Sequence, residues 1–249
     1  MTGSHDPLPS SLDLQTLGLP QGPEHPCPYL EGRLARERAF MADSIPPGLY
    51  HRLMDFGWRR SGRLLYRPDC DGCAECVPIR IPVNEFRPSR TQRKVEKRNA
   101  DLEWRLSVPV PTDEKFDLFV RYQQGRHTGD MCTEREDFER FLYEYPIKSR
   151  ECEARLDGRL LVSAIIDVEP RSISSVYTYY DPGEKHRSLG VAAILALIGY
   201  ARRRGVSHYY LGYHIRGCAK MSYKVAYRPC ELCDSRGTWT RHEPTTEAQ

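Results

Sequence analysis

The stretch SISSVYTYYDPGEKHRSLGVAAILALIGYARRRGVSHYYLGY, residues 172–213, has a strand, helix and strand pattern that decides the expected fold. Residues 172–180 are rich in β-branched and aromatic side chains, as strands are. Residues 189–204 are mostly apolar and end in basic residues before Gly205, which is typical of a helix C-terminus. Residues 206–213 predict a further strand.

The segments upstream of this stretch predict antiparallel strands. Residues 152–156 and 160–168 flank Asp157-Gly158, which is a strong hairpin signal. Helices are expected over 112–127, with Thr112 as N-cap, and from a capping box at Thr133 to residue 143. Antiparallel strands followed by a helix and another strand predict an α+β fold around one mixed sheet.

The first half of the chain has a less regular pattern. We expect helices over residues 32–43, 46–56 and 89–100, a hairpin over 58–68, and strands over 77–83 and 102–108. Pro78 and Pro82 predict that residues 77–83 form an edge strand, because proline has no N–H for a sheet interior. The expected organisation is a flexible N-terminus over 1–26, domains over 27–108 and 109–234, and a tail over 235–249.

The composition is that of a soluble globular protein. The 249 residues include 37 Lys and Arg against 34 Asp and Glu, a formal net charge of +3, with 39% hydrophobic residues. No apolar run approaches the roughly 18 residues that span a bilayer, and the N-terminus lacks a secretory pattern. We therefore expect a cytoplasmic protein with no membrane partner.

Nine cysteines are present, and a reducing compartment favours metal binding or free thiols over disulfides. Cys70, Cys73 and Cys76 follow a Cys-x-x-Cys-x-x-Cys spacing, and Cys27 lies upstream. Such spacing lets two sulfurs reach one metal ion, so zinc and an iron–sulfur cluster are both chemically possible. The alternative is a turn that holds reduced thiols.

The positive charge is concentrated in one part of the chain. Residues 185–228 hold nine Lys and Arg and no Asp or Glu, and residues 87–105 hold seven against three acids. Tyr and His residues are interleaved with the first cluster, a combination that suits RNA because phosphates take the charge and bases stack on rings. The alternative is a solvated helix face beside core tyrosines.

A possible anion-binding turn opens the helix over 189–204. The pattern Arg187-x-x-Gly190-x-Ala192 after a strand resembles the pyrophosphate-binding turn of the acetyl-CoA-dependent N-acetyltransferase (GNAT) fold. Backbone N–H groups at a helix N-terminus bind anions, and glycine lets the anion approach. An acetyl-CoA-dependent N-acetyltransferase is therefore one candidate function.

The most specific segment is YYLGYHIRGCAKMSYK, residues 209–224, continued by Tyr227-Arg228-Pro229. It closely resembles the signature of the arginyl-tRNA–protein transferase family. Its residue pattern is most similar to the bacterial branch of that family, the aspartate/glutamate leucyltransferases. Supporting matches include Cys27-Pro28-Tyr29, Gly57-Trp58-Arg59-Arg60-Ser61-Gly62, Tyr66-Arg67-Pro68, Tyr122-Gln123-x-x-Arg126-His127 and Tyr180-Asp181-Pro182.

The resemblance implies a GNAT-like transferase domain behind an N-terminal, cysteine-containing extension. The implied reaction transfers leucine from an aminoacyl-tRNA to the N-terminal Asp or Glu of an acceptor protein and so creates a degradation signal (N-degron). Arginine stays open as the donor amino acid. No cofactor is required for the chemistry, because the ester is already activated and positioning supplies much of the acceleration.

The resemblance and the residue types together nominate site residues. The catalytic candidates are Asp181, Tyr213, Lys220, Tyr223 and Lys224. Candidates for binding the acidic first residue of the acceptor are Arg126, His127 and Lys224, because a carboxylate needs a cation. Candidates for binding tRNA are Arg187, Arg202, Arg203, Arg216 and Arg228. The tentative metal ligands are Cys27, Cys70, Cys73 and Cys76.

Each candidate also has a structural explanation. Asp181-Pro182 is an ordinary turn pair, and His127 ends a helix, where it complements the dipole. A function from a different class also stays open, namely a non-enzymatic RNA-binding module with a thiol–metal knuckle.

Overall fold

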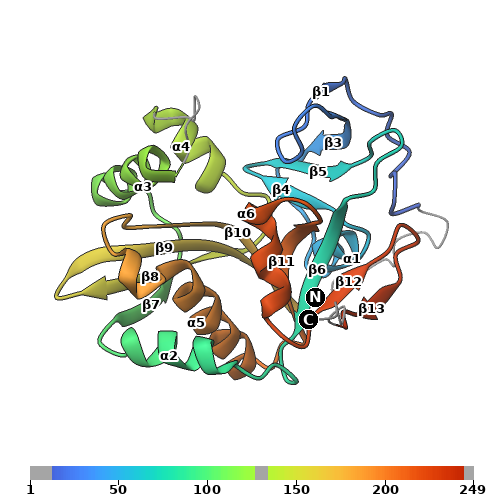
Figure 1. The fold of residues 1–249 in the computed structure, drawn as a ribbon. Coiled ribbons are helices and arrows are strands. Elements are labelled where there is room, and N and C mark those ends of the chain that lie inside the picture. Colours follow the sequence, from blue (N-terminus) through green and yellow to red (C-terminus); the bar gives the residue numbers. More distant parts are fainter. Residues whose placement is uncertain (1–12, 127–133, 244–249) are drawn as a thin grey trace, which may run out of the picture.

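The computed structural model describes residues 13–126 and 134–243, with no description of the Arg126 side chain. Within these ranges eight strands form one sheet in the order β13-β12-β6-β11-β10-β9-β8-β7. The strands are β6 (Cys76–Pro82), β7 (Glu103–Ser107), β8 (Ser149–Leu156), β9 (Arg159–Val168), β10 (Ser172–Tyr180), β11 (His208–Ile215), β12 (Glu231–Cys233) and β13 (Trp239–Arg241). Figure 1 shows this sheet running through the centre of the molecule.

The sheet is mixed, as the sequence predicts. Strands β10 and β11 pair in parallel, and helix α5 (Leu189–Arg203) makes the crossover between them. Strands β8, β9 and β10 are antiparallel neighbours. The hairpin turn between β8 and β9 places Asp157 and Gly158 at φ 50° and φ 83°, as an Asp-Gly turn requires. The α+β fold class is confirmed.

Helices cover both faces of the sheet. Ala164 and Ile166 of β9 belong to the core under α5, whereas Ile165 packs with α3 (Asp113–Arg126) and α4 (Arg135–Leu142). Because successive side chains of a strand point to opposite faces, α5 and the pair α3 and α4 lie on opposite sides. Helix α2 (Arg90–Arg98) packs beside α5 (Figure 1).

The N-terminal segment adds two smaller sheets beside the main one. Strands β3 (Glu37–Met41), β5 (Leu64–Pro68) and β4 (Arg59–Ser61) form one in that order, and β1 (His25–Pro26) pairs with β2 (Leu34–Ala35). Helix α1 (Leu49–Asp55) packs in the same region. The short helices η1 (Lys185–Arg187), α6 (Ala219–Ser222) and η2 (Tyr223–Ala226) complete the described elements.

Several expectations for single elements are wrong. Residues 32–43 form β2 and β3 rather than a helix, because β3 pairs with β5 and Phe40 packs edge-on against Trp58 at 5.5 Å between ring centroids. Strand β6 is not an edge strand, since β11 and β12 flank it. Its prolines are tolerated where pairing is weakest: Pro82 ends the strand and Pro78 lies opposite Tyr213, beside a register shift.

The two chain ends are also more structured than the sequence indicates. Leu14 is buried, and its carbonyl accepts a hydrogen bond of 2.7 Å from Trp58 Nε1, so part of the segment expected to be a flexible entry is packed. Residues 235–243 include β13, and Trp239 packs edge-on against Tyr210. That part of the chain is not a tail.

Strands from both expected domains share one sheet. Strand β6 comes from the first segment and pairs with β11, and β7 pairs with β8. The predicted capping box at Thr133 lies outside the described residues, and α4 begins after Glu134 with no side-chain cap. A capping box does form at the start of α2, between Ser89 and Gln92. No helix in the two described ranges is long and apolar enough to cross a bilayer.

Candidate active site

The candidate site is built around an irregularity in β11. This strand pairs in parallel with β10 only from His208 to Tyr210, and its pairing with β6 shifts register between Tyr210 and Tyr213. Gly212 lies in the shifted part with φ 85°, a left-handed conformation that favours glycine. The chain then turns at Gly217 and returns through α6 and η2 beside β11 (Figure 1).

Lys224 is buried on the returning segment. Its side chain points to β11, where Nζ donates a 2.7 Å hydrogen bond to the Tyr213 carbonyl and lies 3.4 Å from Met221 Sδ. Burial, followed by the nearby Arg59 guanidinium, lowers the pKa of Lys224 to about 7. The amine is therefore partly neutral at physiological pH, which is the condition for a general base.

The other predicted residues of the motif are placed differently. Lys220 is exposed, and Tyr223 is 47% exposed with its ring centroid 6.0 Å from Lys224 Nζ. The Tyr213 hydroxyl donates to the Gly57 carbonyl at 2.6 Å, and burial raises its pKa well above the usual value. Tyr213 thus meets Lys224 through its backbone, while its hydroxyl fastens β11 to the loop after α1.

Arg59 is a site residue that the sequence analysis does not single out. It lies on β4 and is only 4% exposed. Its Nη2 donates a 3.1 Å hydrogen bond to the Gly212 carbonyl, and its guanidinium lies 5.2 Å from the Tyr210 ring and 5.8 Å from the Tyr213 ring. Its Nε and Nη1 are buried and have no hydrogen-bond partner among residues 13–126 and 134–243.

The sequence contains a signal for Arg59, the adjacent pair Arg59-Arg60, but only the structure shows how the two residues differ. Arg59 and Arg60 are adjacent on one strand, so their side chains point to opposite faces. Arg60 forms a fully buried ion pair with Asp167, with Nη2 and Oδ1 2.7 Å apart. Only the fold reveals that one of the two arginines has an acid and the other does not.

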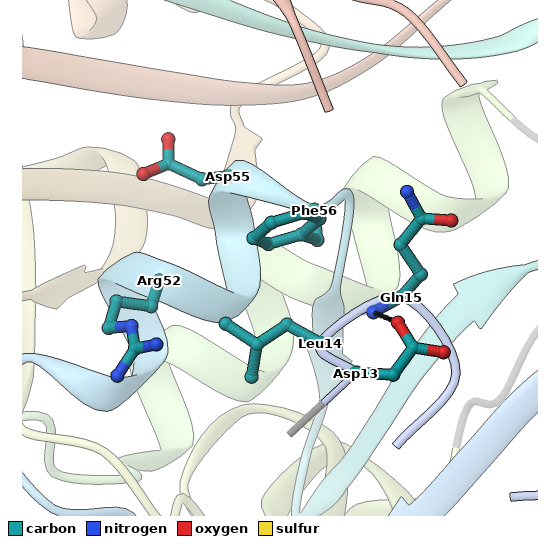
Figure 2. Close-up of a pocket in the computed structure, with 6 residues that line it drawn as sticks. All are labelled: Asp13, Leu14, Gln15, Arg52, Asp55 and Phe56. Carbon is teal, nitrogen blue, oxygen red and sulfur yellow. Dashed lines mark hydrogen bonds between the residues drawn. The ribbon is translucent and has the colours of Figure 1, made fainter. Parts of the chain in front are cut away.

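Tyr210, which lies against Arg59, is held in place through its hydroxyl group. Its hydroxyl donates to Asp55 Oδ1 at 2.5 Å, and Arg80 Nη1 donates to the same oxygen at 2.7 Å. Asp55 also contributes to a pocket of about 370 Å³ beside α1 (Figure 2), lined by Asp13, Leu14, Gln15, Arg52, Asp55 and Phe56. None of these lining residues is among the predicted site residues.

Asp181 occupies a turn immediately after β10. Its Oδ1 accepts a 2.8 Å hydrogen bond from the Gly183 N–H, and its Oδ2 accepts one of 3.2 Å from Arg159. Arg121 lies 4.0 Å from the same oxygen. None of the contacts found in the described ranges joins Asp181 directly to Lys224. His127 lies outside the described residues, and Arg126 ends α3.

The five arginines predicted to bind tRNA fall into two groups. Arg187 makes paired 2.9 Å hydrogen bonds to both carboxylate oxygens of Asp101, and Arg202 donates to the carbonyls of Val83 and Phe86. These two therefore serve the packing of the chain. Arg203, Arg216 and Arg228 are exposed, as Arg202 is despite its two contacts, whereas Arg187 is half-buried.

A second basic surface lies on α2. Its exposed basic residues, called here the basic face, are Arg90, Arg93, Lys94, Lys97 and Arg98, and Glu96 is the acid among them. Gln92 and Val95 are buried on the other side. Arg98 contacts the His186 carbonyl and Arg202 contacts that of Phe86, so α2 and α5 run antiparallel. The exposed Arg203 and Arg204 at the end of α5 therefore lie toward the start of the basic face.

The turn before α5 has partners within the chain. A Cβ at Gly190 would meet the Tyr180 ring at 3.0 Å, so packing accounts for this glycine. Arg187, the basic residue of the motif, is paired with Asp101. Contacts inside the protein thus explain both residues that suggest a pyrophosphate site.

The four cysteines proposed as metal ligands lie near one another. Burial, with further contributions from Cys70, Cys27 and Cys73, raises the pKa of Cys76 to about 12. Cys70 Sγ is within 3.4 Å of both the N–H and the carbonyl of Arg36. Among the residues that the structure describes, no three Cys, His, Asp or Glu side chains are arranged to hold a metal ion. The metal centre stays a prediction, and no chemical step is derived from it.

Comparison with known families gives two matches that together span most of the chain. Residues 25–94 match the family described as "Arginine-tRNA-protein transferase, N terminus", and residues 114–234 match the corresponding "C terminus" family. Solved structures that resemble the fold include a C-terminal domain of a putative lysylphosphatidylglycerol synthetase from Agrobacterium fabrum (TM-score 0.49, 13% identity, 82% of this chain and 65% of that one) and FemX (TM-score 0.46, 10% identity, 75% and 65%).

Relatives with high sequence identity are named "Aspartate/glutamate leucyltransferase". The protein from Pseudomonas syringae pv. tomato is 48% identical over 212 residues, which cover 84% of this chain and 90% of the relative. The protein from Hahella chejuensis is 43% identical over 231 residues, covering 91% and 98%. With both family matches and this level of identity, the chain belongs to the arginyl-tRNA–protein transferase family.

Proposed function

We propose that this protein is an aminoacyltransferase that moves leucine from leucyl-tRNA to the N-terminal Asp or Glu of acceptor proteins. The observation that carries the proposal is the 48% identity to a relative named aspartate/glutamate leucyltransferase. The match covers 84% of this chain and 90% of the relative. The product carries an N-terminal leucine, which would act as a degradation signal. Arginyl transfer to the same acceptors is the second candidate, because the family description names arginine-tRNA.

The reaction joins the acceptor's N-terminal nitrogen to the carbonyl carbon of the leucyl ester. The ester C–O bond breaks, and one proton passes from the amine to the departing tRNA hydroxyl. An unperturbed N-terminal amine has a pKa of about 7.7–8.0, so it needs only a weak base near neutral pH.

In this proposal Lys224 is that base. Its pKa of about 7 leaves a substantial neutral fraction, and burial keeps bulk water from competing for its lone pair. The bond from Nζ to the Tyr213 carbonyl fixes the amine against β11. Lys220 and Tyr223 are on the adjacent exposed turn, where they would contact the substrates rather than fill the core.

The basic face of α2, with Arg203 and Arg204, supports docking of the tRNA. Exposed cations that outnumber the nearby acids neutralise phosphates and release counterions, which makes binding strongly dependent on salt. Arg216 and Arg228 are exposed as well and extend the set of candidate contacts. Arg187 is left out of this role in the proposal because it is paired with Asp101, and Arg202, although exposed, is bound to the carbonyls of Val83 and Phe86.

The alternative of an acetyl-CoA-dependent N-acetyltransferase has less support. It rests on the turn before α5, where Gly190 and Arg187 have packing partners of their own. Its specific expectation is that acetyl-CoA raises the temperature of unfolding.

The test is a transfer assay with three charged tRNA pools and three peptides. Total tRNA is charged separately with leucine, arginine or phenylalanine, and each pool is mixed with peptides that begin with Asp, Glu or Ala. We expect leucine to be transferred to the Asp and Glu peptides and not to the Ala peptide. Transfer of arginine instead would move the donor assignment, and no transfer by folded protein would refute the proposal.

A further inference from the structure

Four basic residues are buried in the described part of the chain, and they differ in their partners. Arg60 pairs with Asp167, and Lys115 pairs with Glu151 at 2.6 Å. Arg59 and Lys224 form no ion pair with any carboxylate of the described residues. Buried charges are normally paired, because removing an ion from water costs several kcal/mol.

The two unpaired cations bind consecutive carbonyls of one short piece of β11. Arg59 donates to the carbonyl of Gly212, and Lys224 donates to the carbonyl of Tyr213. A Cβ at Gly212 would lie 3.6 Å from Lys224 Nζ. The positive charge of Arg59 contributes to the lowered pKa of Lys224, and among the described residues neither side chain forms an ion pair with a carboxylate.

Arg59 in particular has N–H donors that make no hydrogen bond in the described part of the chain. A guanidinium carries five N–H groups, and within the two described ranges only Nη2 of Arg59 has a hydrogen-bond partner. Tyr210 and Tyr213 lie against the guanidinium and keep its position, and the Tyr210 hydroxyl is itself anchored to Asp55. A cation held in a fixed place with free donors is arranged to bind an anion.

We propose that Arg59 binds the side-chain carboxylate of the acceptor's first residue and so sets the preference for Asp and Glu. This inference rests on the proposed function, because it assigns the acidic acceptor to that same site. A guanidinium stays charged at neutral pH and matches a carboxylate in shape, whereas Lys224 is partly neutral.

The same placement separates two roles. In Asp and Glu the carboxylate is only a few bonds from the N-terminal amine, so a carboxylate at Arg59 would keep that amine near the same two residues of β11 that Lys224 contacts. Arg59 would select the acceptor and Lys224 would take its proton. The tRNA phosphates are assigned instead to the exposed cations on α2.

The experiment compares Arg59→Gln with wild-type protein on four peptides that differ only in a first residue of Asp, Asn, Glu or Gln. Leucyl-tRNA is kept saturating, and kcat/KM is measured for each peptide. We expect Arg59→Gln to lower kcat/KM for Asp and Glu by about 10- to 100-fold, the range for losing a charge-assisted hydrogen bond. The values for Asn and Gln should change by less than about threefold, and KM for leucyl-tRNA should not change.

A matched control is Arg63→Gln, since Arg63 lies in the same β4–β5 hairpin and pairs with the exposed Asp43 at the surface. This variant should keep the wild-type ratio of Asp to Asn. Arg59→Lys retains a cation and is the second variant if Arg59→Gln does not fold. It should raise KM for the Asp peptide with little change in kcat.

The outcomes distinguish the inference from the function on which it rests. If wild-type protein transfers leucine to Asp and Glu peptides but Arg59→Gln keeps the full Asp-to-Asn ratio, the role of Arg59 is refuted and the function stands. An equal loss for all four peptides also refutes it, because a merely structural arginine would act on every acceptor alike. If wild-type protein transfers to none of the peptides, the proposed function fails, and the Arg59 assignment fails with it.

Discussion

Replacing Lys224 by methionine should stabilise the protein at low pH while it abolishes transfer. The pKa of Lys224 is lowered from 10.5 to about 7, mainly by burial. The shift is roughly 3.5 units, and at about 1.36 kcal/mol per unit it corresponds to a cost of about 5 kcal/mol for keeping the ammonium in this site. Methionine removes the charge and keeps an unbranched apolar stem, at the loss of one hydrogen bond to Tyr213 worth about 1 kcal/mol.

The free-energy cost of burying the Lys224 ammonium depends on pH, and this dependence distinguishes it from a loss of packing. Below about pH 7 the lysine is protonated in both states, so the folded state bears the whole cost. Between pH 7 and 10.5 the unfolded chain binds a proton that the folded chain does not, so wild-type stability rises with pH. The advantage of Lys224→Met over wild type should therefore shrink by about 3 kcal/mol between pH 6 and pH 9.5.

The measurement is urea unfolding of both proteins at pH 6, 7.5 and 9.5, with the difference in unfolding free energy taken at each pH. Tyrosines that titrate near pH 10 are common to both proteins and cancel in this difference. Lys220→Met, four residues earlier on the exposed turn, is the control and should show no such dependence. A stability difference for Lys224→Met that is the same at all three pH values would refute the reasoning.

Three further predictions follow from the site. If Lys224 must be neutral, a plot of log kcat/KM for the acceptor against pH should have a slope of two below about pH 7, because the lysine and the acceptor amine must each lose a proton. A slope of one would contradict the role of Lys224 as base. The double variant Lys94→Gln/Lys97→Gln should raise KM for leucyl-tRNA about three- to tenfold and lower its salt slope by about two, whereas Lys148→Gln, an exposed lysine outside α2, should change neither. Gly212→Ala should lower the free energy of unfolding by about 1–2 kcal/mol, because φ is 85° there; unchanged urea unfolding would show that the strand relaxes.

Features that depend on neighbours in the chain were predictable from the sequence. The Asp157-Gly158 turn, helix α5 and the strands on either side follow from local patterns, and the structure confirms them. Local pattern failed where pairing with a distant segment decides the conformation. Residues 37–41 become a strand because β5 is available to them, and β6 enters the sheet interior because β11 and β12 flank it.

The candidate site divides in the same way. The motif over residues 209–224 is contiguous, so the sequence alone identified the family to which the chain belongs and nominated Lys224 and its neighbours as candidates. It also indicated a basic surface, but not which arginines are free, since the partners of Arg187 and Arg202 come from residues about 85 to 120 positions away.

The sequence by itself determined the mixed α+β class and the motif around Lys224, because both depend on residues that are neighbours in the chain. Only the tertiary structure decided that Arg59 faces Gly212 across about 150 residues of chain while adjacent Arg60 finds Asp167. The physical reason is that the charge state and specificity of a buried side chain depend on which partners the fold brings to it. Adjacent arginines on a strand are equivalent in the sequence, and the opposite faces of the sheet give one an acid and the other none.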